Sequence, residues 1–403
     1  MAETPALKDS MTSRSRLIVL LVSTPLIVLV VVGGVLGRSM SPQDSYAPLK
    51  TFEEVVNLIV NNYVEPVEPD SIMHGAMRGL AEGLDADSAW LSTEEMAAAN
   101  KRGAEAKGSV GIELTRQYYL RVVSTRDGSP AAKAGLHTGD FVRVIDDKPT
   151  REMSVWAGTR MLRGAPGTKV KLTVLRGNAT EPHVVELVRE EEAAPVLTAK
   201  IVKPGVGLVR VPAFSERTAS DLKSQIASLK KDGATSLIVD LRGTAEGSPE
   251  LGIAPARLFV ADGVLTSKES KGTPKQDVTA AAGDGSVTIP VTLLVTNGTS
   301  QAAEVFAAAL AGHKRATVVG EHTLGRAATQ ELVRLPDGSG LWLSTARYLT
   351  PSGTPIQEKG VLPDVEVAEP DVEFGAAPPT EDPILNKALE KLGAVPAAEK
   401  PAA

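Results

Sequence analysis

Few side chains in this sequence have the type and spacing that bond-breaking chemistry needs. Ser300 stands just before a helix-forming stretch that begins near Ala302, and its hydroxyl could act as a nucleophile beside a base. The nearest lysines in sequence, Lys314 and Lys359, are expected on solvated turns. The structural alternative is a helix cap, because a serine before a helix commonly accepts hydrogen bonds from free helix amides.

Cysteine and histidine chemistry is largely excluded. The chain has no cysteine, which excludes disulfides, thiolate zinc sites and a cysteine nucleophile. The 5 histidines never form a close pair in sequence, so we expect no bound metal and no cofactor. Glu304 with His322 is a weaker carboxylate–histidine candidate, because no hydroxyl is placed between them.

Length and composition indicate a globular protein of several domains. The 403 residues exceed the roughly 250–300 at which one hydrophobic core stops growing. Hydrophobic residues at 42% and charged residues at 23% are ordinary, which excludes wholesale disorder and a multi-span membrane protein. The net charge of -6 argues against a nucleic-acid partner, because phosphate binding needs a clustered positive surface.

An apolar run at the amino terminus predicts a membrane segment. Residues 17–36 carry no charge, and a helix of that length spans about 30 Å of hydrocarbon. Three basic residues precede it and favour a cytoplasmic amino terminus: Lys8, Arg14 and Arg16. A cleaved signal peptide is the alternative, although its apolar region is usually about 7–15 residues long. We expect a cytoplasmic segment at 1–16, a single-pass signal anchor in the inner (cytoplasmic) membrane at 17–37, and the bulk of the chain in the periplasm or otherwise outside the cytoplasm.

Sequence periodicity predicts three blocks after a linker at 38–48. A helical region at 49–107 should hold amphipathic helices at Phe52–Tyr63, at Ser71–Leu84 and from Ser92. A small α+β unit at 108–190 should follow. Its expected strands are Val110–Leu114, Leu120–Val123, Phe141–Ile145 and Val170–Leu175, and its expected helices are Pro130–Ala134 and Val155–Leu162.

Strands alternate with helices in the third block, 196–368, which indicates a layered β-sheet with helices packed on it. The expected strands are Gly207–Val211, Ser236–Leu241, Val291–Val295 and Thr317–Gly320, and the expected helices are Ser220–Leu229 and Ala302–Ala311. A Pro/Ala-rich tail at 369–403 should carry one helix, Pro383–Leu392. The fold class is therefore multidomain α/β and α+β, with an amino-terminal membrane helix.

The glycine spacing of the middle block is distinctive. Gly108-Ser-Val-Gly111-Ile-Glu-Leu114 is followed by Gly128-Ser-Pro-Ala-Ala-Lys-Ala-Gly135-Leu-His-Thr-Gly139-Asp140, which resembles a PDZ domain in the permuted arrangement of bacterial proteases. The resemblance implies a groove that captures an extended peptide and its terminal carboxylate. Its residues are Gly108, Ser109, Val110, Gly111, Ile112, Glu113 and Leu114. A groove filled by the chain itself is the alternative.

The order of the blocks over residues 52–367 resembles the carboxyl-terminal processing (tail-specific) serine proteases. The phrases that support it are Ser236-Leu-Ile-Val-Asp-Leu-Arg242, Arg315-Ala-Thr-Val-Val-Gly-Glu321, Leu343-Ser-Thr-Ala-Arg-Tyr-Leu-Thr-Pro-Ser-Gly353 and Gly360-Val-Leu-Pro-Asp364. The resemblance implies a serine three positions before a helix-opening glutamate. It also implies a lysine base in a Phe-Gly-Lys-Gly turn and a glutamine four residues later that orients it.

Neither member of that dyad is present. The match places Gln301 at the serine position and Arg326 at the lysine position, 25 residues apart as the family requires, and it retains Gln330. Glutamine has no nucleophilic oxygen to offer, and arginine, with a pKa above about 12, stays protonated. The sequence therefore predicts a catalytically degenerate family member. An active serine-type endopeptidase that cleaves protein tails with a displaced nucleophile, Ser300, is the alternative.

The expected oxyanion turn also departs from the family pattern. Active relatives carry Asn-Pro-Gly-Gly after Asp-Leu-Arg, whereas this chain reads Gly243-Thr-Ala-Glu-Gly247. Glu246 stands where the first glycine is expected, next to Gly247. A carboxylate there would repel the developing negative charge. The alternative is that the loop varies and Glu246 points to solvent.

Taken together, the residues predict a membrane-anchored pseudoprotease that binds peptide C-termini or partner proteins in the cell envelope without hydrolysis. The expected partners are peptide C-termini at the PDZ domain and the membrane at the amino-terminal helix. A further copy of the chain or an active protease relative is also expected as a partner. A purely structural interaction protein with an occluded groove is a third possibility.

Overall fold

The computed structural model describes residues 43–102, 107–177, 179, 181–376 and 379–393. The chain divides into two compact units, residues 1–76 and 77–403. The membrane segment that we expect at 17–37 and its cytoplasmic flank lie outside the described residues. Within the described part of the chain, no helix combines the length and the apolar character that crossing a membrane requires.

Helices α2 and α3 make up most of the described part of the first unit. Helix α2 (Gln43–Asn62) begins earlier than expected and takes in part of the predicted linker at 38–48, so that boundary was wrong. Pro48, the last residue of the predicted linker, lies inside this helix. Helix α3 (Pro69–Glu82) follows and runs across the boundary between the units. Phe52, Val55 and Ile59 on α2 are exposed.

The second unit begins with the end of α3, strand β1 (Ala89–Leu91) and helix α4 (Thr93–Arg102). Ser92 and Glu95 form a capping box at the start of α4. The Glu95 amide donates to Ser92 Oγ at 3.2 Å, and the Ser92 amide donates to the Glu95 carboxylate at 2.9 Å. The helix start that the sequence predicts at Ser92 is therefore confirmed.

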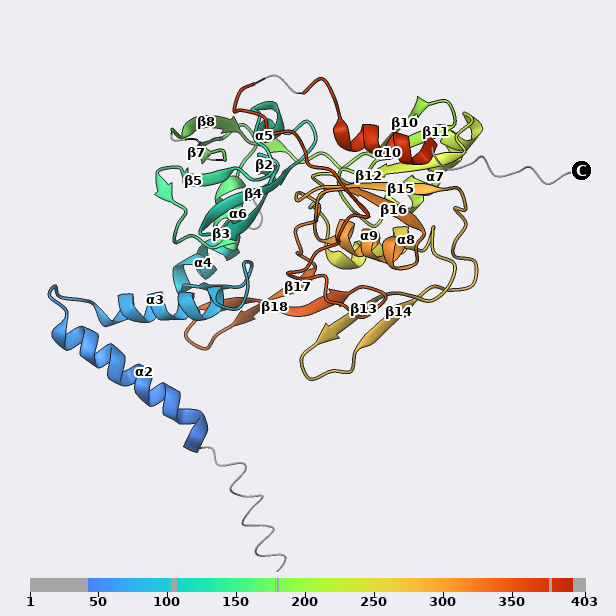
Figure 1. Ribbon diagram of the computed structural model, residues 1–403. Coiled ribbons are helices and arrows are strands. Elements are labelled where there is room, and N and C mark those ends of the chain that lie inside the picture. Colours follow the sequence, from blue (N-terminus) through green and yellow to red (C-terminus); the bar gives the residue numbers. More distant parts are fainter. Residues whose placement is uncertain (1–42, 103–106, 178, 180, 377–378, 394–403) are drawn as a thin grey trace, which may run out of the picture. The chain divides into compact units, whose positions relative to one another are not determined.

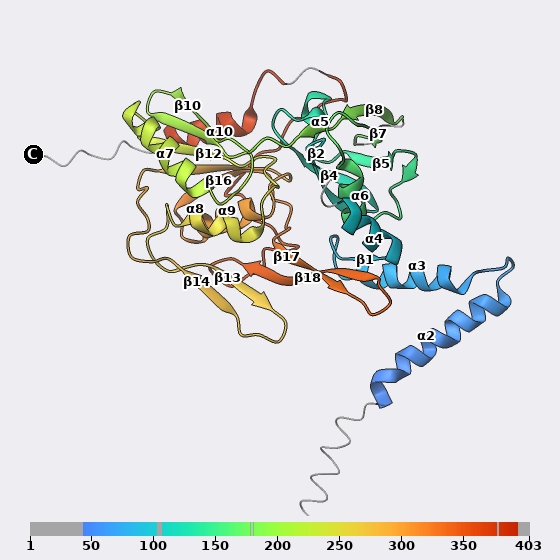
Figure 2. The same cartoon turned by 180° about the vertical axis from the view of Figure 1, so that it is seen from behind.

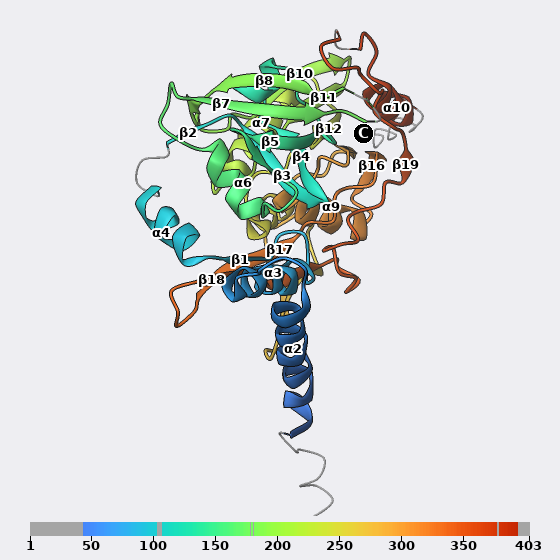
Figure 3. The same ribbon diagram turned by 90° about the vertical axis from the view of Figure 1, so that its left-hand side faces the viewer.

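A middle domain follows, built on an antiparallel sheet in the order β3-β4-β5-β7-β8 (Figure 3). Its elements are β2 (Gly108–Ser109), β3 (Ile112–Gln117), β4 (Tyr119–Thr125), α5 (Pro130–Lys133), β5 (Phe141–Ile145), β6 (Lys148–Pro149), α6 (Val155–Leu162), β7 (Lys169–Leu175), β8 (His183–Val188) and β9 (Glu190–Glu191). Strand β3 pairs only with β4, so its outer edge has no strand partner among the described residues. The predicted strand 110–114 begins later, because Gly111 has φ 74° and turns the chain before β3.

Helix α6 packs on this sheet with Gly158 facing the strands. A Cβ atom built at Gly158 would lie 2.3 Å from Leu120 Cδ1, so any larger residue there would require the Leu120 side chain to shift. Leu114, Leu120 and Val142 are fully buried beneath the helix in one hydrophobic cluster. This packing fixes α6 along the open edge of β3.

The core domain is a six-stranded sheet in the order β10-β11-β12-β15-β16-β19. Its strands are β10 (Thr198–Lys203), β11 (Val206–Arg210), β12 (Ser236–Asp240), β15 (Val291–Val295), β16 (Ala316–Gly320) and β19 (Val365–Glu366). All neighbours are parallel except β10, which pairs antiparallel with β11 at one edge.

Helices cover both faces of this sheet (Figure 1). One face carries α7 (Thr218–Lys231), η1 (Pro249–Gly252), α8 (Ile253–Ala256) and α9 (Ala302–Gly312), and the other carries α10 (Pro383–Gly393). Alternate residues of β12 serve the two faces. Leu237 and Val239 join the larger hydrophobic cluster, and Ile238 joins the cluster beneath α10.

A second sheet, which the sequence did not reveal, lies on the far side of α8 and α9 (Figure 2). It comprises β13 (Val264–Ser270), β14 (Gln276–Thr279), β17 (Ala328–Arg334), β18 (Gly340–Leu349) and β1. Tyr348 and Leu265 connect it to the main cluster, so α9 is buried between two sheets. Strands β13, β14 and β17 are partly exposed and rich in polar residues, so their composition resembles that of loops.

Candidate functional site

Gln301 occupies a sharp turn between the core strand β15 and helix α9. Its backbone has φ 58° and ψ −124°, a conformation that non-glycine residues rarely adopt. Its amide donates to the carbonyl oxygen of Arg326 at 2.7 Å, and its own carbonyl accepts from the Glu304 amide at 3.1 Å. Strain of this kind is common at functional sites. The turn is thus shaped to present the side chain at position 301, although that side chain is an amide.

Ser300 precedes this turn and faces the interior. It is 1% exposed, and its hydroxyl has no hydrogen-bond partner in the described part of the chain. The helix-cap interpretation is not confirmed, because the Ala303 amide donates to the Ser300 backbone carbonyl rather than to its hydroxyl. No base contacts this hydroxyl within the described residues, so the geometry supplies nothing that would remove its proton.

Arg326 is held by two contacts that leave it no freedom to act as a base. Its Nε donates to Asp87 Oδ2 at 2.7 Å, and its Nη1 donates to the Leu114 carbonyl of β3 at 3.0 Å. Burial lowers the pKa of the guanidinium, but the carboxylates of Asp87 and Glu113 outweigh this effect and raise the pKa above its usual range. Arg326 therefore remains a cation and acts as a clamp between domains.

Glu304 fastens the turn that carries position 326. Its fully buried carboxyl accepts from Thr323 Oγ1 at 2.5 Å, from the Gly325 amide at 2.6 Å and from the Arg326 amide at 2.8 Å. Burial raises the pKa of Glu304 to about 7, against the opposing effect of these three hydrogen bonds. The helix-opening glutamate is thus a structural brace between α9 and residues 323–326.

Gln330 lies on β17, where a bulge falls between Thr329 and Gln330. The Nε2 of Gln330 donates to no acceptor among the described residues. This amide nitrogen therefore makes no orienting hydrogen bond within the described residues. The amide instead lines a cavity together with Arg326 and Asp87.

The turn at residues 243–247 lies directly beside position 301. The Ser300 amide donates to the Thr244 carbonyl at 3.0 Å, and the Ala302 amide lies 3.4 Å from the Gly247 carbonyl. A Cβ atom at Gly247 would lie 2.4 Å from the Phe214 carbonyl oxygen, so glycine is required there. This geometry joins the predicted oxyanion loop to the predicted nucleophile turn.

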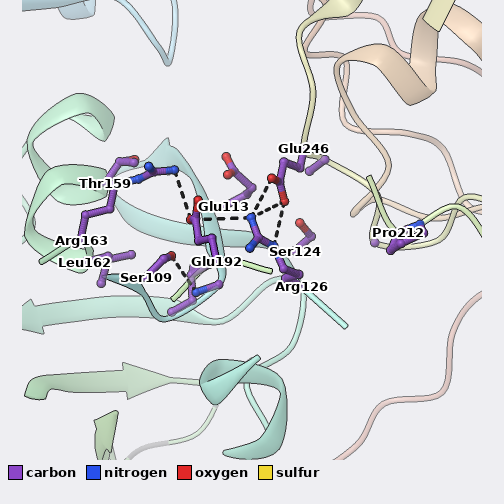
Figure 4. Close-up of a pocket in the computed structure, with 14 residues that line it drawn as sticks. Ser109, Glu113, Ser124, Arg126, Thr159, Leu162, Arg163, Glu192, Pro212 and Glu246 are labelled. Atoms are coloured by element: carbon purple, nitrogen blue, oxygen red, sulfur yellow. Dashed lines mark hydrogen bonds and ion pairs between the residues drawn. The ribbon is translucent and has the colours of Figure 1, made fainter. Parts of the chain in front are cut away.

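The Glu246 carboxylate is paired rather than free. Arg126 of the middle domain donates to it from Nη2 at 2.7 Å and from Nε at 3.0 Å (Figure 4). Arg126 also lies 3.6 Å from Glu192, which in turn lies 3.3 Å from Arg163. The sequence left two expectations for Glu246, a carboxylate that repels the oxyanion or a side chain that points to solvent. The arrangement matches neither, because the charge of Glu246 is compensated and its side chain faces the middle domain. The pair ties the middle domain to the oxyanion turn.

The predicted peptide groove is narrow at its carboxylate loop, whereas a cavity of about 390 Å³ lies further along it, lined by Glu113 of β3 and Thr159 of α6. The loop keeps its expected form, since a Cβ at Gly111 would lie 2.3 Å from Ser129 Cβ. The cavity beside Gly111 and Ile112 has a volume of about 20 Å³, enough for roughly one water. The Leu114 carbonyl on the open edge of β3 already accepts a hydrogen bond from Arg326. A peptide strand added to β3 would have to displace Arg326.

Comparisons with known proteins agree with this architecture. Residues 108–187 match the PDZ domain, and residues 205–367 match Peptidase family S41. A carboxy-terminal-processing protease from Bartonella bacilliformis is 31% identical over 340 residues, which cover 81% of this chain and 77% of the relative. The chain belongs to the S41 peptidase family.

Two further S41 relatives support the assignment. The carboxy-terminal processing protease CtpA of Bacillus subtilis is 31% identical over 78% of this chain and 67% of its own length. Among solved structures, a photosystem II D1 C-terminal processing protease matches with a TM-score of 0.65 and 27% identity, covering 77% of this chain and 85% of that chain. The family resemblance predicted from sequence is therefore confirmed.

Several residues of this S41 site could not be found by sequence reasoning. Asp87 comes from the amino-terminal part of the second unit and reaches Arg326 across the chain. Arg126 of the PDZ domain pairs with Glu246 of the predicted oxyanion turn, and Glu192, which follows that domain, pairs with Arg126. None of the three belongs to a local motif, so only the tertiary structure reveals them. Among the described residues, no group of three or more histidine, aspartate or glutamate side chains is placed to hold a metal ion.

Proposed function

We propose that this S41 member is a pseudoprotease that binds peptide or protein C-termini in the cell envelope without hydrolysing them. The observation that carries the proposal is the pair of side chains at the dyad positions. Gln301 offers no nucleophile, and Arg326 is a permanent cation bonded to Asp87 and to the Leu114 carbonyl. Acyl transfer through these two positions has no chemical route.

Peptide binding is proposed for the PDZ domain. The open edge of β3 beside α6 suits the addition of an extended peptide strand, as in other peptide-binding PDZ domains. The Gly108–Leu114 segment would supply the backbone contacts. In the closed arrangement described above, Arg326 and the Glu246–Arg126 pair stand in the way, so binding would require their release.

We also propose that the chain is anchored by residues 17–37 and acts on the outer side of the cytoplasmic membrane. The support is the uncharged run with its preceding basic residues. In this position it could hold protein tails for an active relative of the family or for a further copy of itself.

The decisive test is an assay of cleavage and binding on the full chain in parallel. Unfolded and tail-tagged protein substrates are incubated with it, and products are followed by mass spectrometry. We expect intact substrates together with saturable binding of peptides that carry a free carboxyl end. The same peptides with amidated ends should bind to the PDZ groove at least about 10-fold more weakly, since the carboxylate contacts are charge-assisted.

A Ser300→Ala variant is the matched control for the alternative enzyme. Time-dependent fragments that disappear in Ser300→Ala would contradict the pseudoprotease proposal and establish the displaced nucleophile. Loss of binding to every free-carboxyl peptide, without any cleavage, would favour a purely structural interaction protein.

A further inference from the structure

Residues 367–376, which we call the strap, run from the core domain to the PDZ domain. The strap leaves the core sheet directly after β19, where the Val367 amide donates to the Gly320 carbonyl at 2.9 Å. The chain is back on the core domain at Asp382, whose carboxylate accepts from Arg242 at 2.9 Å just before α10. Figure 1 shows the strap in red, reaching the PDZ domain between these two points. The chain is therefore attached to the core domain before and after it contacts the PDZ domain.

Phe374 is the side chain through which the strap contacts the PDZ domain. Its ring stacks on the imidazole of His183 at the start of β8, with the ring centroids 4.4 Å apart and the ring planes 9° apart. The Arg176 guanidinium lies 4.9 Å from the centroid of the same ring, and its Nη1 donates to the Val372 carbonyl at 3.2 Å. Phe374 also packs, partly buried, against the hydrophobic cluster of the PDZ domain. A ring and a backbone carbonyl thus fasten the strap to the PDZ domain.

The seat that receives Phe374 is held by the PDZ domain itself. Nε and Nη2 of Arg176 donate to the two carboxylate oxygens of Asp140, each at 2.7 Å, and Nη2 also donates to the Gly135 carbonyl at 2.6 Å. Asp140 is 1% exposed, so this bidentate pair fixes the guanidinium. His183 is held in the β7–β8 ladder. The seat therefore keeps its shape without the strap, and release of Phe374 would leave the PDZ fold in place.

The seat and the peptide groove lie at opposite edges of the PDZ sheet. In the strand order β3-β4-β5-β7-β8, His183 is on the last strand, whereas Arg326 of the core domain donates to Leu114 on the first. The core domain therefore contacts the PDZ domain at both edges of its sheet. Breaking the contacts at β3 alone leaves the PDZ domain attached at β8.

We propose that the strap is a latch that holds the PDZ domain closed against the core domain, with Phe374 as its catch. Closed denotes the arrangement in which Arg326 and Glu246 contact the PDZ domain. Opening then requires Phe374 to leave its seat as well, so the stacking adds to the stability of the closed state. This inference rests on the proposed function, because it assigns a control to the same peptide site. It goes further, because a molecule that displaced the strap would open the groove without entering it.

The test measures distances between the two domains in the full chain. The chain has no cysteine, so two can be introduced and spin-labelled at exposed positions, Lys171 on β7 and Lys223 on α7. Pulsed electron paramagnetic resonance then gives the distribution of distances between the labels. Binding of N-acetyl-Ala-Ala-Leu-Ala-Ala with a free carboxyl end is measured in parallel by calorimetry.

We expect Phe374→Ala to raise the ratio of open to closed chains about 5- to 10-fold, seen as a second population of distances. The affinity for the peptide should rise by a similar factor, because apparent affinity follows the fraction of chains that can bind. Phe374→Tyr keeps the stacked ring and should behave like the parent. Leu362→Ala truncates an apolar side chain of the core domain that is 74% exposed, and it is the matched control.

Two variants and two readouts keep the latch separate from the proposed function. His183→Ala removes the other ring of the stack and should give the same new distances, which covers the case in which Phe374→Ala misfolds. Distances that match the parent in both alanine variants would overturn the latch, whatever the peptide does. New distances in both variants without peptide binding by any chain would support the latch and contradict tail capture. New distances in Phe374→Tyr equal to those in Phe374→Ala would overturn the role of the stacked ring.

Discussion

The backbone amide of Gln301 donates to the carbonyl oxygen of Arg326 at 2.7 Å. The two positions that the sequence match assigns to the dyad are therefore joined through their main chains. The Arg326 side chain donates to Asp87, whereas Oε1 of Gln301 has no hydrogen-bond partner among the described residues. This backbone link between positions 301 and 326 is in place, so the side chains at the two positions can be exchanged and tested without redesigning the turn that holds them.

The Asp87–Arg326 ion pair should be a major contributor to stability. The Arg326 side chain is mostly buried, so Arg326→Met would leave the Asp87 carboxylate buried without a counter-charge. We expect a loss of about 3–5 kcal/mol in the free energy of unfolding, measured by denaturant titration. Combining it with Asp87→Asn should recover part of the loss. Equal losses in the single and double variants would contradict this coupling.

Restoring the dyad should not restore catalysis while Asp87 is present. In Gln301→Ser with Arg326→Lys, the new ammonium would lie beside the Asp87 carboxylate, which favours its charged form and prevents it from accepting a proton. We expect no labelling by a fluorophosphonate probe at neutral pH. Adding Asp87→Asn removes that carboxylate and should give measurable labelling.

The outcome of this experiment also bears on the oxyanion turn. If the triple variant is labelled but cleaves no peptide, the altered turn at Gly243–Gly247 is the remaining defect, because labelling does not test it as stringently as hydrolysis does. If the double variant is labelled as strongly as the triple, then Asp87 does not control the base position.

The sequence predicted those elements whose periodicity is strong. Helix α6 and strand β15 have the boundaries that the pattern indicates, Val155–Leu162 and Val291–Val295. The sheet of β13, β14, β17 and β18 was missed. Strands β13, β14 and β17 are half-exposed and rich in polar residues, and the apolar residues of β18 do not alternate strictly with polar ones. The existence of this sheet depends on pairing between residues far apart in the chain.

The two positions of the proposed dyad could be located from local spacing, but the long-range contacts of the site could not. Gln301 and Arg326 could be located because each belongs to a short motif next to a helix or a turn. Asp87 contacts Arg326 from 239 residues away, and Arg126 contacts Glu246 from 120 residues away. Ion pairs at such separations follow from domain packing, which no local pattern encodes.

The Glu246–Arg126 pair should restrain the PDZ domain. Glu246→Gln removes the charge that Arg126 neutralises, and since the pair is partly exposed we expect the affinity for a free-carboxyl peptide to rise by about 5-fold. Hydrogen exchange at 243–247 should accelerate as well. Glu216→Gln, at an exposed position before α7, is the matched control. A peptide affinity equal to that of the parent would show that the pair does not oppose binding.

Glu304 should make stability depend on pH in a defined window. Its pKa is raised by burial from 4.5 in the unfolded chain to about 7 in the fold, so the folded state binds a proton that the unfolded state has released between these values. The free energy of unfolding should therefore fall as the pH rises from about 4.5 to about 7, by about 3 kcal/mol in total. Glu304→Gln cannot ionise and should remove this contribution.

The measurement is a set of denaturant titrations at several pH values, comparing the parent with Glu304→Gln. Glu331→Gln, at an exposed position on β17, is the control and should leave the slope of the parent unchanged. Glu304→Gln lowers the stability at acid pH through weaker hydrogen bonding to Gly325 and Arg326, so the slope, and not the absolute value, is decisive. A slope that survives in Glu304→Gln would assign the pH dependence to other groups.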